Sequence, residues 1–417
     1  MAYRIKEIKK NLAKLKIYKI LVYMYFFTKS FGIQRGNISL MLRLLNYKRN
    51  NGYSDEEHLT STIRWLCNAQ DENLNDNGVA SVYSLRNGWE CSYPETSGYI
   101  IATFLTYSEL TGKEEYTERA KKIGDWEIDI QAKSGGVYSD MKFDNIAAFN
   151  TGQVMLGWLA LYEKLGIEKY LNAAERAGNY LCEVQDVNGT WVKGSYSGAR
   201  TYESRVDWAL LKLSKITNNE KYKEYAIKNI DWIINQQNSN GWFENCGFHM
   251  NDPIMHTIDY TIRGLLECHI IEPIDLQKYK IMERIKLVIE KILNTLEKQK
   301  VQGRIGLIPS SYDPTWQGCV EDSCLTGNAQ FCALLLRLSG IEGHNECYES
   351  WARVILNSLK DLQVIDSKNN VIDGGVAGSY PIYQGYMRNS FPNWAAKFFA
   401  DALIMQNKIE DKVTVDA

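Results

Sequence analysis

The phrase WEIDIQAKSGGVY, residues 126–138, decides the fold because similar phrases recur along the chain. In each copy a helical pattern ends at a glutamine and a glycine-rich turn follows. The glutamines are Gln70, Gln131, Gln185, Gln237, Gln299 and Gln363, spaced by 61, 54, 52, 62 and 64 residues. Self-similarity at a nearly constant spacing is the signature of a repeat architecture. The sequence therefore predicts one assembly of six structural units.

The six copies also share a register. In four of them an aromatic residue stands five positions before the glutamine: Trp65, Trp126, Tyr180 and Trp232. In four of them a glycine stands four positions after it: Gly135, Gly189, Gly241 and Gly303. This register predicts that the turns share one local structure, in which glutamine and aromatic residue pack and cap the outer helices.

Each interval between glutamines contains two helical patterns. Between Gln131 and Gln185, residues 150–162 are apolar on all sides, whereas residues 167–184 alternate apolar and polar positions at helical spacing. A helix that is apolar all round is buried, and an amphipathic one covers it. The sequence therefore predicts an inner and an outer helix in each repeat.

Counting the helices predicts a closed ring. Residues 55–69 form an outer helix without an inner partner, and residues 393–406 an inner helix without an outer one. Pairing these two ends gives an all-α (α/α)6 toroid over residues 51–406, with a basic arm at 1–50 and a polar tail at 407–417. An open helical array is the alternative.

The motif Q-x-x-x-G-x-W at Gln185, Gly189 and Trp191 matches the QW motif of terpenoid cyclases. Over about residues 55–405 the chain resembles the α/α-toroid superfamily, which includes terpenoid cyclases, protein prenyltransferase β subunits and many carbohydrate-active enzymes. The resemblance implies an (α/α)6 barrel and says little about chemistry.

The net charge of -2 conceals an asymmetry. Residues 1–49 carry twelve Lys and Arg and one Glu, a charge of +11, while residues 50–417 carry 36 basic and 49 acidic residues, a charge of -13. The apolar run at 17–27 is too short to span a bilayer. The arm is predicted either to lie on an anionic membrane face or to pack on the acidic body. No nucleic-acid partner is expected from this charge distribution.

The nine cysteines form no disulfide framework, which is typical of a reducing cytosol. Cys319 and Cys324 are spaced C-x4-C without paired histidines, and buried thiols explain them better than zinc. Phosphate-binding loops, dinucleotide fingerprints and H-E-x-x-H are absent from the sequence. We therefore expect no cofactor and no metal.

Polar and aromatic segments lead into the otherwise apolar inner helices. They cover residues 89–99, 143–153, 197–208, 249–263, 315–330 and 380–394. Unpaired polar groups are costly to bury, so these segments are expected to line a wide pocket at one mouth of the ring.

Candidate residues follow from these segments. The predicted catalytic residues are Tyr260, His256, Asp259, Glu203, Glu321 and Asp322. The predicted substrate-binding residues are Arg200, Arg263, Arg388, Tyr93, Glu95, Asn150, Trp316, Tyr386, Asn389, Asn393 and Trp394. Aromatic faces with acids, amides and arginines suit an oligo- or polysaccharide.

Two mechanisms are open. In the first, an arginine neutralises a uronate carboxylate while Tyr260 and His256 exchange a proton with the sugar, as a lyase or C5-epimerase requires. In the second, two carboxylates among the predicted acids hydrolyse a glycoside. Residues 92–99, SYPETSGY, are similar to a stretch in glucuronyl C5-epimerases.

Two further function classes stay open. Terpenoid cyclisation or prenyl transfer would need D-x-D-D, D-D-x-x-D or a zinc site, and Asp313, Cys319 and His344 are too loosely spaced for zinc. A non-catalytic glycan-binding toroid is the other. The sequence favours a carbohydrate-active enzyme on a uronic-acid-containing or other surface glycan, in the cytoplasm at the inner face of the membrane.

Overall fold

The structure is a computed structural model. It describes residues 52–415 except 73–75, 196, 249–252, 302–305, 320 and 366–368. The basic arm predicted at residues 1–50 lies outside the described residues.

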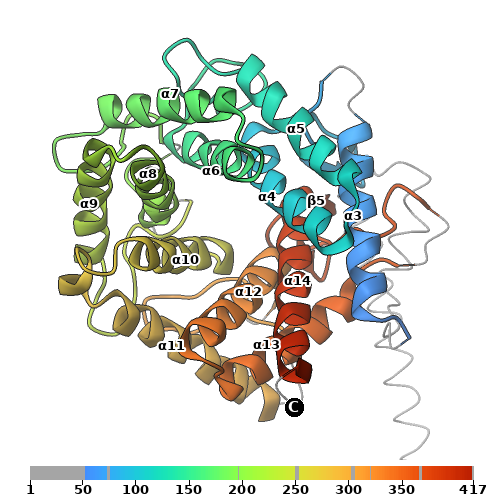
Figure 1. The fold of residues 1–417 in the computed structure, drawn as a ribbon. Helices are drawn as coiled ribbons and strands as arrows, with labels where there is room; N and C mark the ends of the chain where they lie inside the picture. The colour runs from blue at the N-terminus through green and yellow to red at the C-terminus, as the bar shows by residue number, and fades with distance from the viewer. Residues whose placement is uncertain are drawn as a thin grey trace, which may run out of the picture.

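Two concentric layers of helices form the ring (Figure 1). The inner helices are α4 (Pro94–Thr111), α6 (Ala148–Leu165), α8 (Ser204–Thr217), α10 (Met255–Ile271), α12 (Leu325–Glu342) and α14 (Asn393–Val415). The outer helices are α3 (Asp55–Asp71), α5 (Glu114–Asp129), α7 (Glu168–Val184), α9 (Glu220–Asn235), α11 (Ile281–Val301) and α13 (Glu346–Leu362). Each inner helix packs against the next, and α14 packs against α4. The predicted (α/α)6 toroid is confirmed.

The two layers differ in burial as the sequence pattern predicts. In α12 every residue from Leu325 to Leu336 is buried. In α13 the buried residues, Trp351, Ala352, Ile355, Leu356 and Leu359, lie on one face. An all-round apolar helix needs neighbours on every side, which the position inside the ring supplies.

The repeated glutamine joins neighbouring outer helices. Gln131, at the end of α5, donates from Nε2 to the carbonyl of Gly135 at 2.7 Å and to that of Ala173 in α7 at 3.1 Å. Gln237, at the end of α9, likewise donates to Gly241 and to Arg284 in α11. The repeat phrase therefore fixes helix packing, as expected.

The position of the repeated glycine leaves no room for a side chain. Gly135 has a φ of +96°, and a Cβ there would lie 2.3 Å from the carbonyl oxygen of Arg176. Positive φ and close backbone approach both favour glycine. This explains why glycine recurs four residues after the glutamine.

The ends of the chain close the ring through the same phrase. Gln363, after α13, donates to the carbonyl of His58 at 3.2 Å and to the hydroxyl of Thr62 at 2.8 Å, both in α3. The Trp65 indole donates to the carbonyl of Val371 at 2.9 Å. The predicted pairing of the first outer helix with the last inner helix, α3 with α14, is confirmed.

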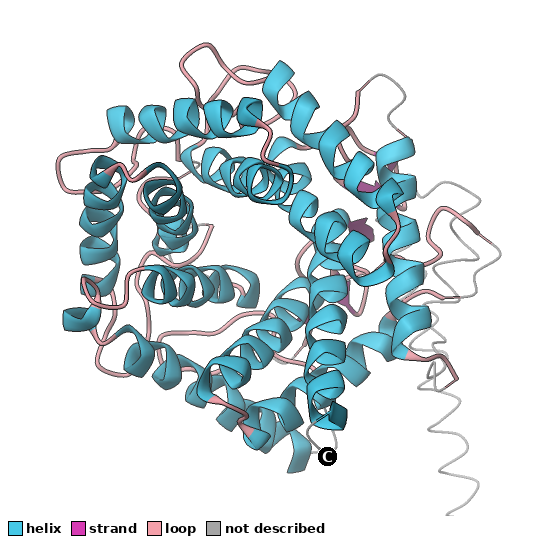
Figure 2. Cartoon of the chain, viewed as in Figure 1, coloured by secondary structure: helices cyan, strands magenta, loops and turns pink. Residues whose placement is uncertain are grey.

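Short strands occur in the segments that lead into the inner helices (Figure 2). β1 (Val82–Ser84) pairs with β2 (Gly88–Trp89) and with β5 (Ser390–Pro392), all antiparallel, and β3 (Ser323–Cys324) pairs with β4 (Ser379–Tyr380). The sequence pattern did not predict these strands. The β1–β5 pair joins the segment before α4 to the segment before α14, which adds a second closure of the ring.

Two further observations concern the helices. The last inner helix, predicted over residues 393–406, continues to Val415. Within the described residues, none of the helices combines the length and apolarity needed to cross a bilayer.

Candidate active site at one mouth of the barrel

The segments leading into different inner helices meet at one mouth, as expected. Phe248, before α10, lies parallel to Tyr386, before α14, with ring centroids 6.1 Å apart and an angle of 19° between the planes. His256, in the first turn of α10, lies 5.5 Å from the same Tyr386 ring. Tyr386 also approaches Trp394, at the start of α14, at 6.4 Å. Rings from distant parts of the sequence therefore converge here.

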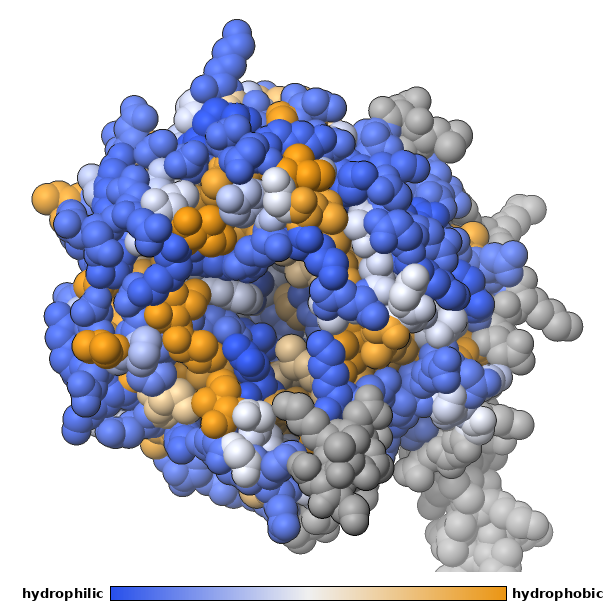
Figure 3. Space-filling model, in the orientation of Figure 1, coloured by the Kyte–Doolittle hydropathy of each residue, from blue (hydrophilic) through white to orange (hydrophobic). Residues whose placement is uncertain are grey.

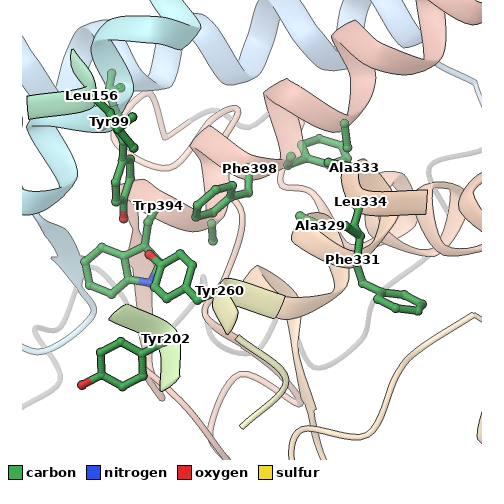
Figure 4. Close-up of a cluster of buried hydrophobic side chains, with 14 of the residues drawn as sticks. Tyr99, Leu156, Tyr202, Tyr260, Ala329, Phe331, Ala333, Leu334, Trp394 and Phe398 are labelled. Atoms are coloured by element: carbon green, nitrogen blue, oxygen red, sulfur yellow. The ribbon is translucent and has the colours of Figure 1, made fainter. Parts of the chain in front are cut away.

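A layer of aromatic rings crosses the barrel below this mouth. We call Tyr99, Phe149, Tyr260 and Phe398 the aromatic layer; they come from α4, α6, α10 and α14. The Tyr260 centroid lies 5.2 Å from that of Phe149 and 6.1 Å from that of Phe398. Tyr99 lies 5.5 Å from Phe398. Figure 4 shows Tyr99, Tyr260, Phe398 and Trp394 pointing toward one another.

Glu95 supplies an ionisable group to the mouth. Tyr93 is the residue that caps α4, and Pro94 begins the helix, a position that suits the fixed φ of proline. Burial raises the pKa of the half-buried Glu95 carboxyl to about 7, while a hydrogen bond from Tyr93 and the charge of Arg205 oppose the rise. Glu95 can thus give or take a proton near neutral pH.

Tyr99 and Tyr260 supply two hydroxyls. Both side chains are buried, and neither hydroxyl has a hydrogen bond of ordinary geometry within the described residues. Burial, above all, raises the pKa of both phenols, and the two hydroxyls affect each other. Both therefore remain protonated and can act as donors to a ligand.

His256 is held in one tautomer. Its Nδ1 lies 2.7 Å from Oε1 of Gln330, in α12. An amide oxygen only accepts, so Nδ1 carries the proton and Nε2 keeps its lone pair. Burial lowers the pKa of His256 to about 4, although the hydrogen bond that it donates to Gln330 acts in the opposite direction. The ring is thus neutral at physiological pH.

Several predicted acids and arginines have other surroundings. Arg200 donates from Nε to the Ser197 hydroxyl at 3.1 Å, and Arg263 donates from Nε to Glu267 at 2.9 Å. Glu203 is buried, with no ion pair in the described residues, and burial raises its pKa. Glu203 and Arg200 therefore form no ion pair with each other.

The remaining charged predictions lie apart from the aromatic layer. Glu321 and Arg388 are exposed. Asp322 accepts a short hydrogen bond from the Ser310 hydroxyl through Oδ1. Asp259 faces a separate cavity of about 260 Å³, described below. The sequence alone did not show that Glu95 lies at the mouth and that these acids do not.

The predicted amides and Trp316 hold loops. Asn150 donates to the carbonyls of Tyr138 at 3.1 Å and Ser139 at 3.3 Å, and Asn393 donates to that of Ala80 at 3.0 Å. The Asn389 backbone N–H donates to Ile382 at 2.6 Å. The Trp316 indole donates to Asn240 at 3.1 Å. These contacts position the mouth segments, which is a structural role.

Of the predicted residues, the structure brings Tyr93, Glu95, His256, Tyr260, Tyr386 and Trp394 to the mouth. Sequence reasoning missed Tyr99 and Phe398, because both look like ordinary core residues of apolar helices. Arg205 was not among the predicted site residues either. Arg205 makes no ion pair within the described residues.

No metal site is visible in the part of the chain that the structure describes: nowhere do three His, Cys, Asp or Glu side chains group as ligands would. Cys324 is buried and its sulfur accepts from the Gly327 N–H at the start of α12, whereas Cys319 is exposed. All nine cysteines are free.

Several solved structures share this architecture. Unsaturated glucuronyl hydrolase from Bacillus sp. GL1 superposes with a TM-score of 0.67 at 13% identity, covering 87% of this chain and 98% of that one. A sugar epimerase from a ruminal bacterium gives 0.67 at 13%, covering 85% and 98%. A polysaccharide lyase gives 0.62 at 14%, covering 86% and 99%.

The chain has the α/α-toroid fold. The similarity spans nearly the whole length of those structures, and at this identity it shows the fold alone. No protein-family model and no curated protein matches the sequence.

Proposed function

We propose that this protein is a carbohydrate-active enzyme that moves a proton at the carbon next to a uronate carboxylate in a glycan. One observation carries the proposal: the Glu95 carboxyl, whose pKa is about 7, shares a mouth with the protonated hydroxyls of Tyr99 and Tyr260. A base and an acid with separated pKa values in one pocket are what proton transfer at carbon requires.

The proposed base is Glu95. Its carboxylate removes the proton from C5 of the uronate, and the electron pair moves into the adjacent carboxylate to give an enolate. The hydroxyls of Tyr99 and Tyr260 donate hydrogen bonds to the developing charge, and the positive charge of Arg205 lies behind the Tyr260 ring, 4.8 Å from its centroid. This differs from the sequence-based hypothesis, in which Tyr260 and His256 exchanged the proton.

Tyr260 is the proposed acid. In elimination, the C4–O bond breaks, a C4–C5 double bond forms, and the leaving oxygen takes the Tyr260 proton. In epimerisation, Tyr260 returns a proton to C5 from the opposite face. The neutral His256 ring has its centroid 4.3 Å from that of Tyr260. Its Nε2 can accept a hydrogen bond from a sugar hydroxyl.

The sugar faces have aromatic partners at the mouth. Phe248, Tyr386 and Trp394 present rings from two of the segments that lead into inner helices. Ring faces stack on the apolar faces of pyranoses while polar groups meet the hydroxyls. Glycan substrates also occur in the names of the solved structures that share this fold, which supports the proposal.

Glycoside hydrolysis is the second candidate. The pKa of Glu95, about 7, leaves part of the carboxyl protonated and able to act as a general acid. Hydrolysis with two carboxylates needs a partner across the sugar. Glu203 is sealed in the protein, Glu321 is exposed and Asp322 is bonded to Ser310, so this candidate has less support.

Solvent deuterium tests the proposal. The full chain would be incubated in D₂O with uronate-containing oligosaccharides and followed by mass spectrometry and ultraviolet absorbance. An epimerase incorporates deuterium at C5, and a lyase produces an unsaturated, absorbing end. New reducing ends with neither signal would replace the proposal by hydrolysis, and binding without any product would replace it by a glycan-binding role.

We also propose that residues 1–49 bring the enzyme to an anionic membrane face, where a lipid-linked glycan would be presented. The charge of +11 supports this. Deleting the arm should abolish sedimentation with anionic vesicles at low salt and leave the circular dichroism of the toroid unchanged. Equal sedimentation of both proteins would refute the membrane role.

A further inference from the structure

A second cavity lies on the other side of the aromatic layer. We call it the charged chamber: about 260 Å³, lined chiefly by Arg205, Trp208, Asp259, Arg263, Lys397 and Asp401. It extends to Thr106 and Lys408, several turns into α4 and α14, and so opens toward the end of the barrel opposite the mouth site. Figure 3 shows the hollow at the centre of the ring.

Arg205 is the key group in this chamber. The residue is 4% exposed, and its guanidinium carbon lies 4.8 Å from the Tyr260 ring centroid and 5.2 Å from that of Trp208. Nε donates to Oε1 of Gln153 at 2.7 Å. The two terminal nitrogens make no hydrogen bond or ion pair in the described residues, although Arg205 lines the chamber. Glu95 and Asp259 attract this charge but form no ion pair with it in the described residues. A buried charge without a directly bonded counter-ion is costly, so it indicates a missing anion.

The other charged groups around the chamber do not neutralise the positive charge of Arg205. Glu267 is shared by Arg263, at 2.9 Å, and Arg337, at 3.1 Å, which leaves one positive charge over the three groups. Lys397 is paired with Asp401. Lys408 is exposed at the rim. The chamber thus carries excess positive charge.

Asp259 is the one acid of the chamber lining without an ion pair in the described residues. Its side chain is 2% exposed, and Oδ1 has no partner there. Burial raises its pKa to about 7, against the charges of Arg263 and Arg205. Below that pH it is a neutral carboxylic acid that can donate a hydrogen bond.

We propose that the charged chamber binds a small sugar acid or sugar phosphate, with the anionic group on the terminal nitrogens of Arg205 and a hydroxyl on Asp259. The volume is slightly below the roughly 300–1,000 Å³ of ordinary ligand pockets, so the ligand has about the size of one monosaccharide. The Trp208 ring offers a face for the pyranose. This site is separate from the mouth and does not depend on the reaction proposed there.

Titration calorimetry on the full chain tests the site. Glucuronate, glucose 6-phosphate, glucose and inorganic phosphate would be compared at pH 6. We expect glucuronate or glucose 6-phosphate to bind at least ten-fold more tightly than glucose, and which of the two binds better identifies the anion. Equal binding of glucose, or binding of inorganic phosphate alone, would overturn the proposal.

Variants locate the binding. Arg205→Gln should weaken binding of the anion at least ten-fold. Arg353→Gln, which removes an exposed arginine of α13, should leave the affinity unchanged. Equal affinity of Arg205→Gln and wild type would place the ligand elsewhere and refute the proposal.

Asp259→Asn gives a test that a folding defect cannot imitate, because the proposal predicts that this variant binds the ligand more tightly than wild type. The ionisable groups lining the chamber are Arg205, Asp259, Arg263, Lys397, Asp401 and Lys408; α4 and α12 contribute none. Asp259 is the lining group whose pKa, about 7, lies between pH 6 and pH 8. Glu95 has a similar pKa and acts on Arg205 in wild type and variant alike, so comparing the two proteins isolates Asp259. With glucuronate, which stays ionised across this range, wild-type affinity should therefore fall, and Asp259→Asn should bind several-fold more tightly than wild type at pH 8. A variant that binds no more tightly than wild type at pH 8 would contradict the assignment.

Discussion

The two ends of the barrel use different parts of the same inner helices. At the mouth, Glu95 and the rings of Tyr386 and Trp394 come from first turns and from the segments before them. In the charged chamber, Arg263 and Asp401 come from positions further along α10 and α14. Loops on a rigid scaffold commonly carry function, and here the helices carry charge as well. The comparison suggests two sites with different ligands.

The sites share three side chains. Arg205 lines the chamber and stacks on Tyr260 of the aromatic layer. Gln330 also lines the chamber and holds Nδ1 of His256. Phe398 belongs to the aromatic layer and lines the chamber as well. Variants at either end should therefore separate the functions, provided that these three shared residues are left intact.

The largest expected effect is at Glu95. In Glu95→Gln the side chain keeps its shape and its hydrogen-bond acceptor for Tyr93, but it cannot take a proton. Loss of a general base typically lowers turnover about 10²–10⁴-fold. Turnover would be measured by deuterium incorporation at C5 or by the absorbance of an unsaturated product.

Anion binding in the chamber provides the control for Glu95→Gln. Because Glu95 does not line the chamber and is mostly protonated at pH 6, glucuronate or glucose 6-phosphate should bind this variant at pH 6 as it binds wild type. Loss of both turnover and binding would mean that the two ends are one site.

Tyr260→Phe should lower turnover by about 10²-fold, since it removes one donor and keeps the ring. The ring contacts with Phe149 and Phe398 would persist, so the unfolding midpoint should hardly change. Tyr202→Phe is a matched control, because the Tyr202 ring contacts Phe149 and Phe248 but its hydroxyl has no proposed role in proton transfer. Full turnover by Tyr260→Phe would remove it as the acid.

The pH profile distinguishes the two candidate mechanisms. If Glu95 is the base, the active form is the carboxylate, so kcat/KM should rise with pH and level off above the pKa of about 7. If it is a general acid in hydrolysis, kcat/KM should fall across the same range. A rate that does not change between pH 6 and pH 8 would exclude Glu95 from both roles.

The ring could be predicted from the sequence because its signal is repeated. Gln131 and Gln237 make the same two carbonyl contacts in different repeats, so one spacing rule describes both. Periodicity also distinguished the buried α12 from the amphipathic α13.

The site could be predicted only in part, because its properties depend on neighbours distant in sequence. Asp259 and Tyr260 are adjacent, yet Asp259 lines the chamber and Tyr260 belongs to the aromatic layer. Tyr99 ends the quoted segment 89–99, but nothing local distinguishes it from the other aromatic residues of that segment. Arg205 stands between two acids in the sequence, Glu203 and Asp207, and only the packing of α8 shows that it contacts aromatic rings instead.

The last expected effect concerns stability rather than turnover and tests whether Asp259 is protonated in the folded chain. An unfolded aspartate has a pKa of about 4, whereas burial raises that of Asp259 to about 7. Between these values the folded state retains a proton that the unfolded state releases. The Asp259 contribution to the free energy of unfolding is therefore fully present below about pH 4 and is lost as pH rises to 7, by up to about 4 kcal/mol.

Urea unfolding at pH 5, 6, 7 and 8 measures this effect. Asp259→Asn cannot titrate, so it should gain stability relative to wild type as pH rises from 5 to 7, and the difference should then become constant. The exposed Asp129→Asn in α5 should follow the wild-type curve. A parallel course for Asp259→Asn would show that the carboxyl is ionised in the folded state; the chamber would then carry one more negative charge, and the contrast between the two ends would weaken.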